Sequence, residues 1–197
     1  MSELQPSNTD AILGGQTPPP LNSAVLGGIA GIEQQLINQW GLSKESISRF
    51  GFETVFVNDN AEIIDRQQKE SFCYTVDING VPLEIVYIPA GSFMMGGFDE
   101  AQISHRLPEP LHIVTLQPFF MGKYPVTQKQ YLSLMGTNPS RFHADDRHPV
   151  EEVSWRDAME FCRRLSELTN KNLTLPSESQ WEYACRAGTD TNFYFGR

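Results

Sequence analysis

Cysteine is scarce in this sequence, and the few cysteines form no recognisable pattern. The 197 residues include three of them, Cys73, Cys162 and Cys185, which are odd in number and widely spaced. Such a set argues against a disulfide framework, and the lack of a CxxC motif argues against a structural zinc site. Cys162 and Cys185 fall among apolar residues on expected helix faces, so we predict that both thiols are buried.

Positive charge and long apolar runs are also scarce. The sequence has 15 Lys and Arg against 24 Asp and Glu, a formal net charge of -9, which disfavours binding to nucleic acid or to an anionic membrane surface. No apolar run reaches the length of a membrane span. The N-terminus lacks the basic patch and apolar core of a secretory signal, so we expect a cytoplasmic protein without nucleic-acid or membrane partners.

Familiar catalytic and nucleotide-binding motifs are missing as well. The glycine pairs at 14–15, 27–28 and 96–97 match neither a P-loop nor a dinucleotide-binding fingerprint, and no Ser/His/Asp arrangement stands out. Cys185 lies near an expected helix C-terminus, where the helix dipole disfavours a thiolate nucleophile. The residues therefore assign no catalytic, cofactor-binding or metal-binding position.

Two polar clusters resemble metal sites only in part. Residues 143–148 hold two imidazoles and two carboxylates in a Pro-flanked loop without fixed ligand spacing, so a solvated loop is favoured over a metal site. They are His143, Asp145, Asp146 and His148. Asp77, Asn79 and Gly80 share the start of a calcium loop but not its remaining ligands, and a hairpin turn is the better interpretation.

Large aromatic side chains gather near the expected starts of two helices. Trp155, Trp181 and Tyr183 could together form a recognition surface. Aromatic residues in such positions more often anchor a helix to the core, and this second interpretation is favoured here.

The chain divides into three regions. Residues 1–28 are rich in Pro, Gly, Ser and Asn and are expected to form a tail or linker. Residues 29–80 form an extension, with a short helix ending near Trp40 and then strands around a hairpin turn at 58–60. Residues 81–197 form the main domain, beginning with strands in LEIVYIPAG, SFMMGG and PLHIVTL. The strand FFMGKY lies between Pro118 and Pro125, so it should be short or at a sheet edge.

Three capping boxes mark the helices of the last third. Each has a hydroxyl residue at the N-cap and an acceptor side chain three residues later that can reach back to the cap. The pairs are Thr127 with Gln130, Ser154 with Asp157, and Ser177 with Gln180. Strands followed by helices predict an α+β fold.

The faces of the last two helices follow from the same spacing. The helix from 155 to about 168 should bury one apolar row and pair Glu160 with Arg164 on its wet side. The buried row is Ala158, Phe161, Cys162, Leu165 and Leu168. The final helix should pair Glu182 with Arg186 and stop at Gly188.

Four motifs, in order along residues 83–197, resemble the formylglycine-generating enzyme or sulfatase-modifying factor family. They are LEIVYIPAGSFMMGG, FFMGKYPVTQKQYLSLMGTNPSRF, HPVEEVSWRDAMEFCRRLSE and LTLPSESQWEYACRAGTDTNFYFG. The strands before them resemble the lead-in of bacterial relatives, especially cyanobacterial ones. Thr174 departs from the family, which usually has Arg just before Leu-Pro, so a contact made by that Arg elsewhere is in doubt here.

The resemblance implies a C-type-lectin-like fold and a copper-dependent oxidation of a client sulfatase cysteine to formylglycine by O2. The copper-binding cysteine pair and the calcium loops belong to the family's C-terminal half, and no matching residue is found here. Cys162 and Cys185 correspond to helix positions and not to the catalytic pair, so no catalytic residue is carried over. We therefore expect a domain incomplete at its C-terminus, inactive alone, and marginally stable or prone to aggregate.

Three functional hypotheses remain open from the sequence. The first is a sulfatase-modifying-factor-like domain that acts on a client protein when complete. The second is a non-catalytic lectin-like module for binding or display, of the kind that diversity-generating retroelements vary. The third is a gene remnant. The role of residues 1–80, the client and the oligomeric state are not determined by the sequence.

Overall fold

The computed structural model describes residues 28–58, 62–96 and 111–189. Its elements, in chain order, are α1 (Gly28–Trp40), a 3-10 turn (Lys44–Ser46), β1 (Ile47–Val57), β2 (Ile63–Ile78), β3 (Val81–Ile88), β4 (Gly91–Met95), β5 (His112–Leu116), β6 (Phe119–Gly122), α2 (Gln128–Met135), α3 (Trp155–Thr169) and α4 (Glu178–Arg186). Strands precede the main helices, as expected for an α+β fold. The expected tail lies outside the described residues, apart from Gly28.

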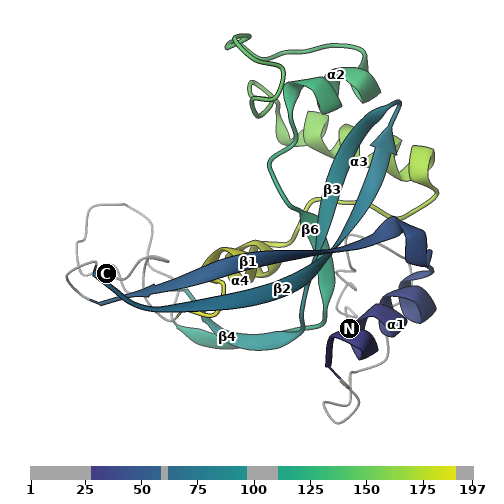
Figure 1. Cartoon of the computed structure of the whole chain (residues 1–197). Coiled ribbons are helices and arrows are strands. Elements are labelled where there is room, and N and C mark those ends of the chain that lie inside the picture. Colours follow the sequence, from purple (N-terminus) through teal and green to yellow (C-terminus); the bar gives the residue numbers. More distant parts are fainter. Residues whose placement is uncertain (1–27, 59–61, 97–110, 190–197) are drawn as a thin grey trace, which may run out of the picture.

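An antiparallel sheet with the strand order β1-β2-β3-β6 organises the domain. Figure 1 shows β1 and β2 as a long twisted ribbon, with α2 and α3 grouped at one end. β2 has 16 residues and continues through the polar run at 66–71. The run stays extended because it pairs residue by residue with β1, from Val55 opposite Arg66 to Phe50 opposite Ser71.

The turn at Asn79-Gly80 joins β2 to β3, which confirms the predicted hairpin. Asn79 and Gly80 have φ values of 51° and 87°, the left-handed conformation that such a dipeptide tolerates. The Gly80 N–H donates to Asp77 Oδ1 at 3.0 Å, so this carboxylate supports the turn. β2 and β3 pair from Cys73 opposite Val86 onward, and the extension therefore shares one sheet with the main domain.

The remaining strands lie as the sequence predicted. β4 and β5 form a separate two-stranded antiparallel sheet, and residues 97–110 between them lie outside the described residues. β6 has four residues and forms the edge of the larger sheet beside β3.

The core covers one face of the larger sheet. Paired residues on β2 and β3 share this face, among them Val76 opposite Leu83, and both are buried. The α1 helix lies against the same face, where the Trp40 ring meets the Phe120 ring edge-on at 5.1 Å between centroids. Leu36 is fully buried, so the short predicted helix is confirmed as a core element.

All three predicted capping boxes are present. In each, the N-cap hydroxyl accepts from the N3 backbone N–H, and the N3 side chain accepts from the cap N–H. The α4 helix ends as predicted: Ala187, at φ 49°, is the C-cap, and Gly188 follows it at C′ with φ 88°. Glu182 accepts from Arg186 as expected, at 2.8 Å.

The apolar face of α3 is narrower than predicted. Phe161 and Leu165 are buried, but Leu168, the last member of the predicted row, is 46% exposed. Arg164 donates to Glu160 at 2.8 Å, which confirms the predicted pair. Hydrogen bonds from Arg163 and Arg164 lower the pKa of Glu160 to about 2.

Candidate functional site

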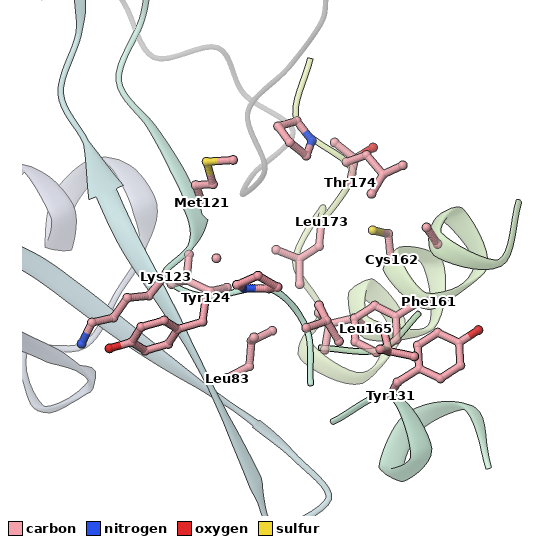
Figure 2. Close-up of a pocket in the computed structure, with 18 of the residues that line it drawn as sticks. Leu83, Met121, Lys123, Tyr124, Tyr131, Phe161, Cys162, Leu165, Leu173 and Thr174 are labelled. Atoms are coloured by element: carbon pink, nitrogen blue, oxygen red, sulfur yellow. The ribbon is translucent and has the colours of Figure 1, made fainter. Parts of the chain in front are cut away.

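A pocket of about 480 Å³ opens between the larger sheet and the helices α2 and α3. Figure 2 shows Leu83 and Met121 on the sheet side, Phe161 and Leu165 on the α3 side, and Leu173 between them. Segments far apart in the sequence therefore build it: β3, β6 with the link to α2, α2, the loop before α3, α3, and residues 173–176 with Trp181.

Ring stacking and backbone bonds hold the walls together. The rings of Tyr131 on α2 and Phe161 on α3 stack at 5.5 Å with 5° between their planes. The Val150 N–H donates to the Val126 carbonyl at 2.9 Å, which ties the loop before α3 to the link before α2. Both valines line the pocket, so its shape depends on contacts between elements that are distant in sequence.

The pocket is apolar in character. Of the described residues that line it, Lys123 is the only one with a charge. Its ammonium donates to Glu84 Oε1 at 3.1 Å and lies 4.6 Å from the Phe50 ring centroid, and the hydrogen bond to Glu84 raises its pKa. Because that charge is already paired, the pocket is suited to apolar groups and not to ions.

The three thiols lie on three different elements, and all of them are free. Cys73 on β2 is buried and donates to Glu84 Oε1 at 3.6 Å. Cys162 on α3 is half-buried and lines the pocket, whereas Cys185 on α4 is exposed, so the predicted burial of Cys185 was wrong. The face of α4 that carries Cys185 is not covered by another described element.

These thiols do not fit the copper site that the family's oxidation chemistry requires. Such a site needs two thiolates in one shared environment, but Cys73 on β2 is buried, Cys162 on α3 is half-buried and Cys185 on α4 is exposed. Burial also raises the pKa of the Cys73 and Cys162 thiols, which disfavours the thiolate form that binds metal.

The thiols should react with iodoacetamide in the order of their exposure. We expect Cys185 to be alkylated first, Cys162 more slowly, and Cys73 roughly tenfold or more slower than Cys185, since it must wait for the sheet to open. A time course followed by peptide mass spectrometry measures all three at once, with the urea-unfolded chain as the control. Equal rates for Cys73 and Cys185 in the folded chain would contradict the burial of β2.

The polar loop at 143–148 is largely exposed, as expected for a solvated loop. Its imidazoles and Asp146 are exposed. Asp145 accepts from the Arg147 guanidinium at 2.6 Å, and this hydrogen bond lowers the pKa of Asp145 to about 2. Within 28–58, 62–96 and 111–189, no group of three His, Cys, Asp or Glu side chains is placed to hold a metal ion.

The tryptophans at the helix starts are not core anchors, which corrects the favoured prediction. Trp155 is 70% and Trp181 is 57% exposed. Tyr183 does anchor α4: its ring lies 5.4 Å from Phe93 and 6.4 Å from Phe119. For the two tryptophans, the alternative interpretation as a recognition surface therefore stands. Trp181 also lines the pocket.

Thr174 lies in the pocket wall. Thr174 thus contributes a neutral side chain to the pocket wall, at the position where the sequence departs from the expected family pattern. Reasoning from the sequence did not identify the pocket itself. The only feature of the sequence that pointed to the pocket was the apolar face of each of two helices. The sheet residues that complete the pocket cannot be recognised from their spacing in the sequence.

Among the described helices, none combines the length and the apolar character that crossing a bilayer requires.

Comparison with known proteins finds the same family that the sequence motifs resemble. The family model described as the sulfatase-modifying factor enzyme 1-like domain matches residues 79–197. A "Chaperone protein LppX" of Paenibacillus barcinonensis is 35% identical, over 38% of this chain and 38% of its own length. The formylglycine-generating enzyme of Thermomonospora curvata is 27% identical, over 56% of this chain and 51% of its own length. The chain thus spans about 40–50% of these relatives.

Two solved structures share the fold. PvdO from Pseudomonas aeruginosa is similar with a TM-score of 0.51 and 30% identity, covering 60% of this chain and 53% of that chain. Treponema denticola variable protein 1 is similar with a TM-score of 0.53 and 24% identity, covering 61% of this chain and 59% of that chain. The C-type-lectin-like α+β fold that the sequence predicted is confirmed.

The family match begins at the β2–β3 turn and includes β3 to α4, so it takes in every helix and strand that lines the pocket. This chain belongs to the sulfatase-modifying factor enzyme 1-like domain family.

Proposed function

We propose that this chain binds a segment of a client protein in its apolar pocket and does not itself oxidise the client's cysteine. The observation that carries the proposal is the combination of an apolar pocket of about 480 Å³ with three thiols on separate elements. The first feature suits apolar side chains that flank a reacting cysteine. The second gives no support to a copper-binding thiolate pair within this chain.

The client is inferred from the family. Formylglycine-generating enzymes are among the relatives of this chain, and the family's client is a sulfatase segment with a reactive cysteine. Because this chain spans about half of the Thermomonospora curvata enzyme, oxidation would need thiols from polypeptide outside these 197 residues. The role of this chain is then to position the client.

Binding and turnover can be tested separately. We expect a fluorescent peptide from a sulfatase cysteine motif to bind, as followed by anisotropy, while O2 consumption with added copper stays at the background of copper and peptide alone. Ala158→Phe should fill the pocket and weaken peptide binding roughly tenfold, the order of effect of losing a buried apolar contact. Ala144→Phe, in an exposed loop, is the matched control and should bind like the wild type.

Two results would contradict this proposal. Oxygen turnover above background would show that the chain's own thiols suffice. Equal binding by wild type and Ala158→Phe would place the client elsewhere.

The alternative is a non-catalytic module for binding or display. The exposed Trp181 at the pocket favours it, as exposed aromatic side chains are typical of recognition surfaces. A scrambled peptide of the same composition distinguishes the two: client positioning requires preference for the native order, whereas a display module has no reason to prefer a sulfatase segment.

A further inference from the structure

The two edges of the larger sheet differ in how they are protected. β6 has four residues between Pro118 and Pro125, so another strand has little to pair with. β1, at the opposite edge, has 11 residues and no proline. In the part of the chain that the structure describes, no strand pairs with the outer side of β1. Half of its backbone N–H and C=O groups are therefore open to pair with an added strand.

The side chains along β1 do not block such pairing. Charges are the usual protection of an edge strand, and β1 carries only Arg49 and Glu53, in a chain of net charge -9. Phe52 and Val55 are each 41% exposed, and the Phe50 and Phe52 rings lie 5.9 Å apart on one face. The edge is thus long and apolar, with its two charges balanced.

The sequence of β1 is complementary to itself around Gly51. When two copies run antiparallel with Gly51 opposite Gly51, Arg49 faces Glu53, Phe50 faces Phe52 and Ser48 faces Thr54, and each contact occurs twice. In the register with Phe50 opposite Phe50, Arg49 faces Gly51, and in the register with Phe52 opposite Phe52, Arg49 faces Val55. The ion pairs with Glu53 are lost in both. Opposite charges and aromatic pairs stabilise cross-strand neighbours, so the register centred on Gly51 is preferred.

The contacts already present within one chain are compatible with this register. Arg49 pairs with Glu33 of α1 at 2.6 Å, and Glu53 pairs with Arg66 of β2. Bringing Glu53 of a second copy beside Arg49 extends these pairs into a chain of alternating charge. A side chain at position 51 also has room, because its Cβ would meet only the Lys69 carbonyl, at 3.8 Å.

We propose that β1 is a homodimer interface, at which a second copy of this chain adds its own β1 in antiparallel orientation around Gly51. The two four-stranded sheets then form one sheet of eight strands. The contact uses the same edge on both copies, so it closes as a dimer and does not propagate into a filament.

The oligomeric state of the full chain tests the interface. In sedimentation velocity we expect a concentration-dependent dimer, which Phe52→Lys weakens roughly tenfold or more because it places two lysines in the joined edge. Ile113→Lys is the matched control: Ile113 is 72% exposed on β5, in the other sheet, and its replacement should leave the dimer intact. A monomer at all concentrations, open-ended aggregation of the wild type, or a dimer unaffected by Phe52→Lys would overturn the proposal.

A disulfide tests the register. In a Cys185→Ser background, which removes the exposed native thiol, Gly51→Cys should form a covalent dimer under mild oxidation, because position 51 faces itself across the two-fold axis. Thr54→Cys should not, because it faces Ser48 of the other copy. No covalent dimer with Gly51→Cys, or equal yields from both variants, would overturn the register.

Discussion

Phe120→Ala is expected to lower the free energy of unfolding by about 3–5 kcal/mol. Phe120 is fully buried, and its ring lies 5.1 Å from that of Trp40 and 5.7 Å from that of Tyr87. Truncation removes both edge-on ring contacts and leaves a cavity where α1 meets the sheet. Since a domain is typically stable by about 5–15 kcal/mol, the variant should lose a large part of its stability in urea denaturation followed by tryptophan fluorescence.

Phe142→Ala is the matched control. Phe142 is 67% exposed, and the same truncation there should change the stability by about 0.5 kcal/mol or less. Similar losses for both variants would mean that α1 is not packed on the sheet as described. The two measurements together therefore test whether the extension belongs to the core.

Gly91→Ala is expected to destabilise the chain by about 1–3 kcal/mol, the usual range for overpacking. A Cβ at position 91 would overlap the Tyr183 hydroxyl oxygen and lie 3.2 Å from the ring carbon that bears it. The Tyr183 ring cannot simply move aside, since it packs against Phe93 and Phe119. The strain should therefore loosen α4 from β4, which thermal melting by circular dichroism would detect.

A double mutant separates this clash from other effects of the substitution. Tyr183→Phe removes the overlapping oxygen, so Gly91→Ala should cost clearly less in that background than in the wild type. Gly51→Ala is a strand glycine with ordinary space around its Cβ and serves as the control. If Gly91→Ala costs the same with and without the Tyr183 hydroxyl, then β4 and α4 do not approach as closely as described.

The contact between α4 and β4 also positions the pocket. The Gly96 N–H donates to Glu182 Oε1 at 3.1 Å, and Arg186 donates to the Gly96 carbonyl at 2.8 Å. These bonds hold the helix that carries Trp181 against the smaller sheet. Loosening α4 is thus expected to disturb the pocket wall.

The sequence was sufficient to predict those features whose interacting residues lie close together in the chain. A hydroxyl three residues before an acceptor side chain defines a capping box without help from the rest of the chain, and all three boxes formed. The Asn79-Gly80 turn and the pairs of Glu160 with Arg164 and of Glu182 with Arg186 are local in the same way.

Burial could not be predicted with equal success, because it depends on which element covers a given face. Trp155, Leu168 and Cys185 follow helical spacing as well as Phe161 and Leu165 do, yet only the last two meet the sheet. The continuity of β2 has the same cause, since the polar residues 66–71 are extended only because β1 lies beside them.

The sequence by itself determined the family, the α+β order of the elements and the ends of the helices, because motifs and caps are made by residues close together in the chain. Only the tertiary structure decided the pocket, the separation of the three thiols and the open edge at β1. Each of these depends on side chains or strands that are brought together, or left uncovered, by contacts between residues far apart in the sequence.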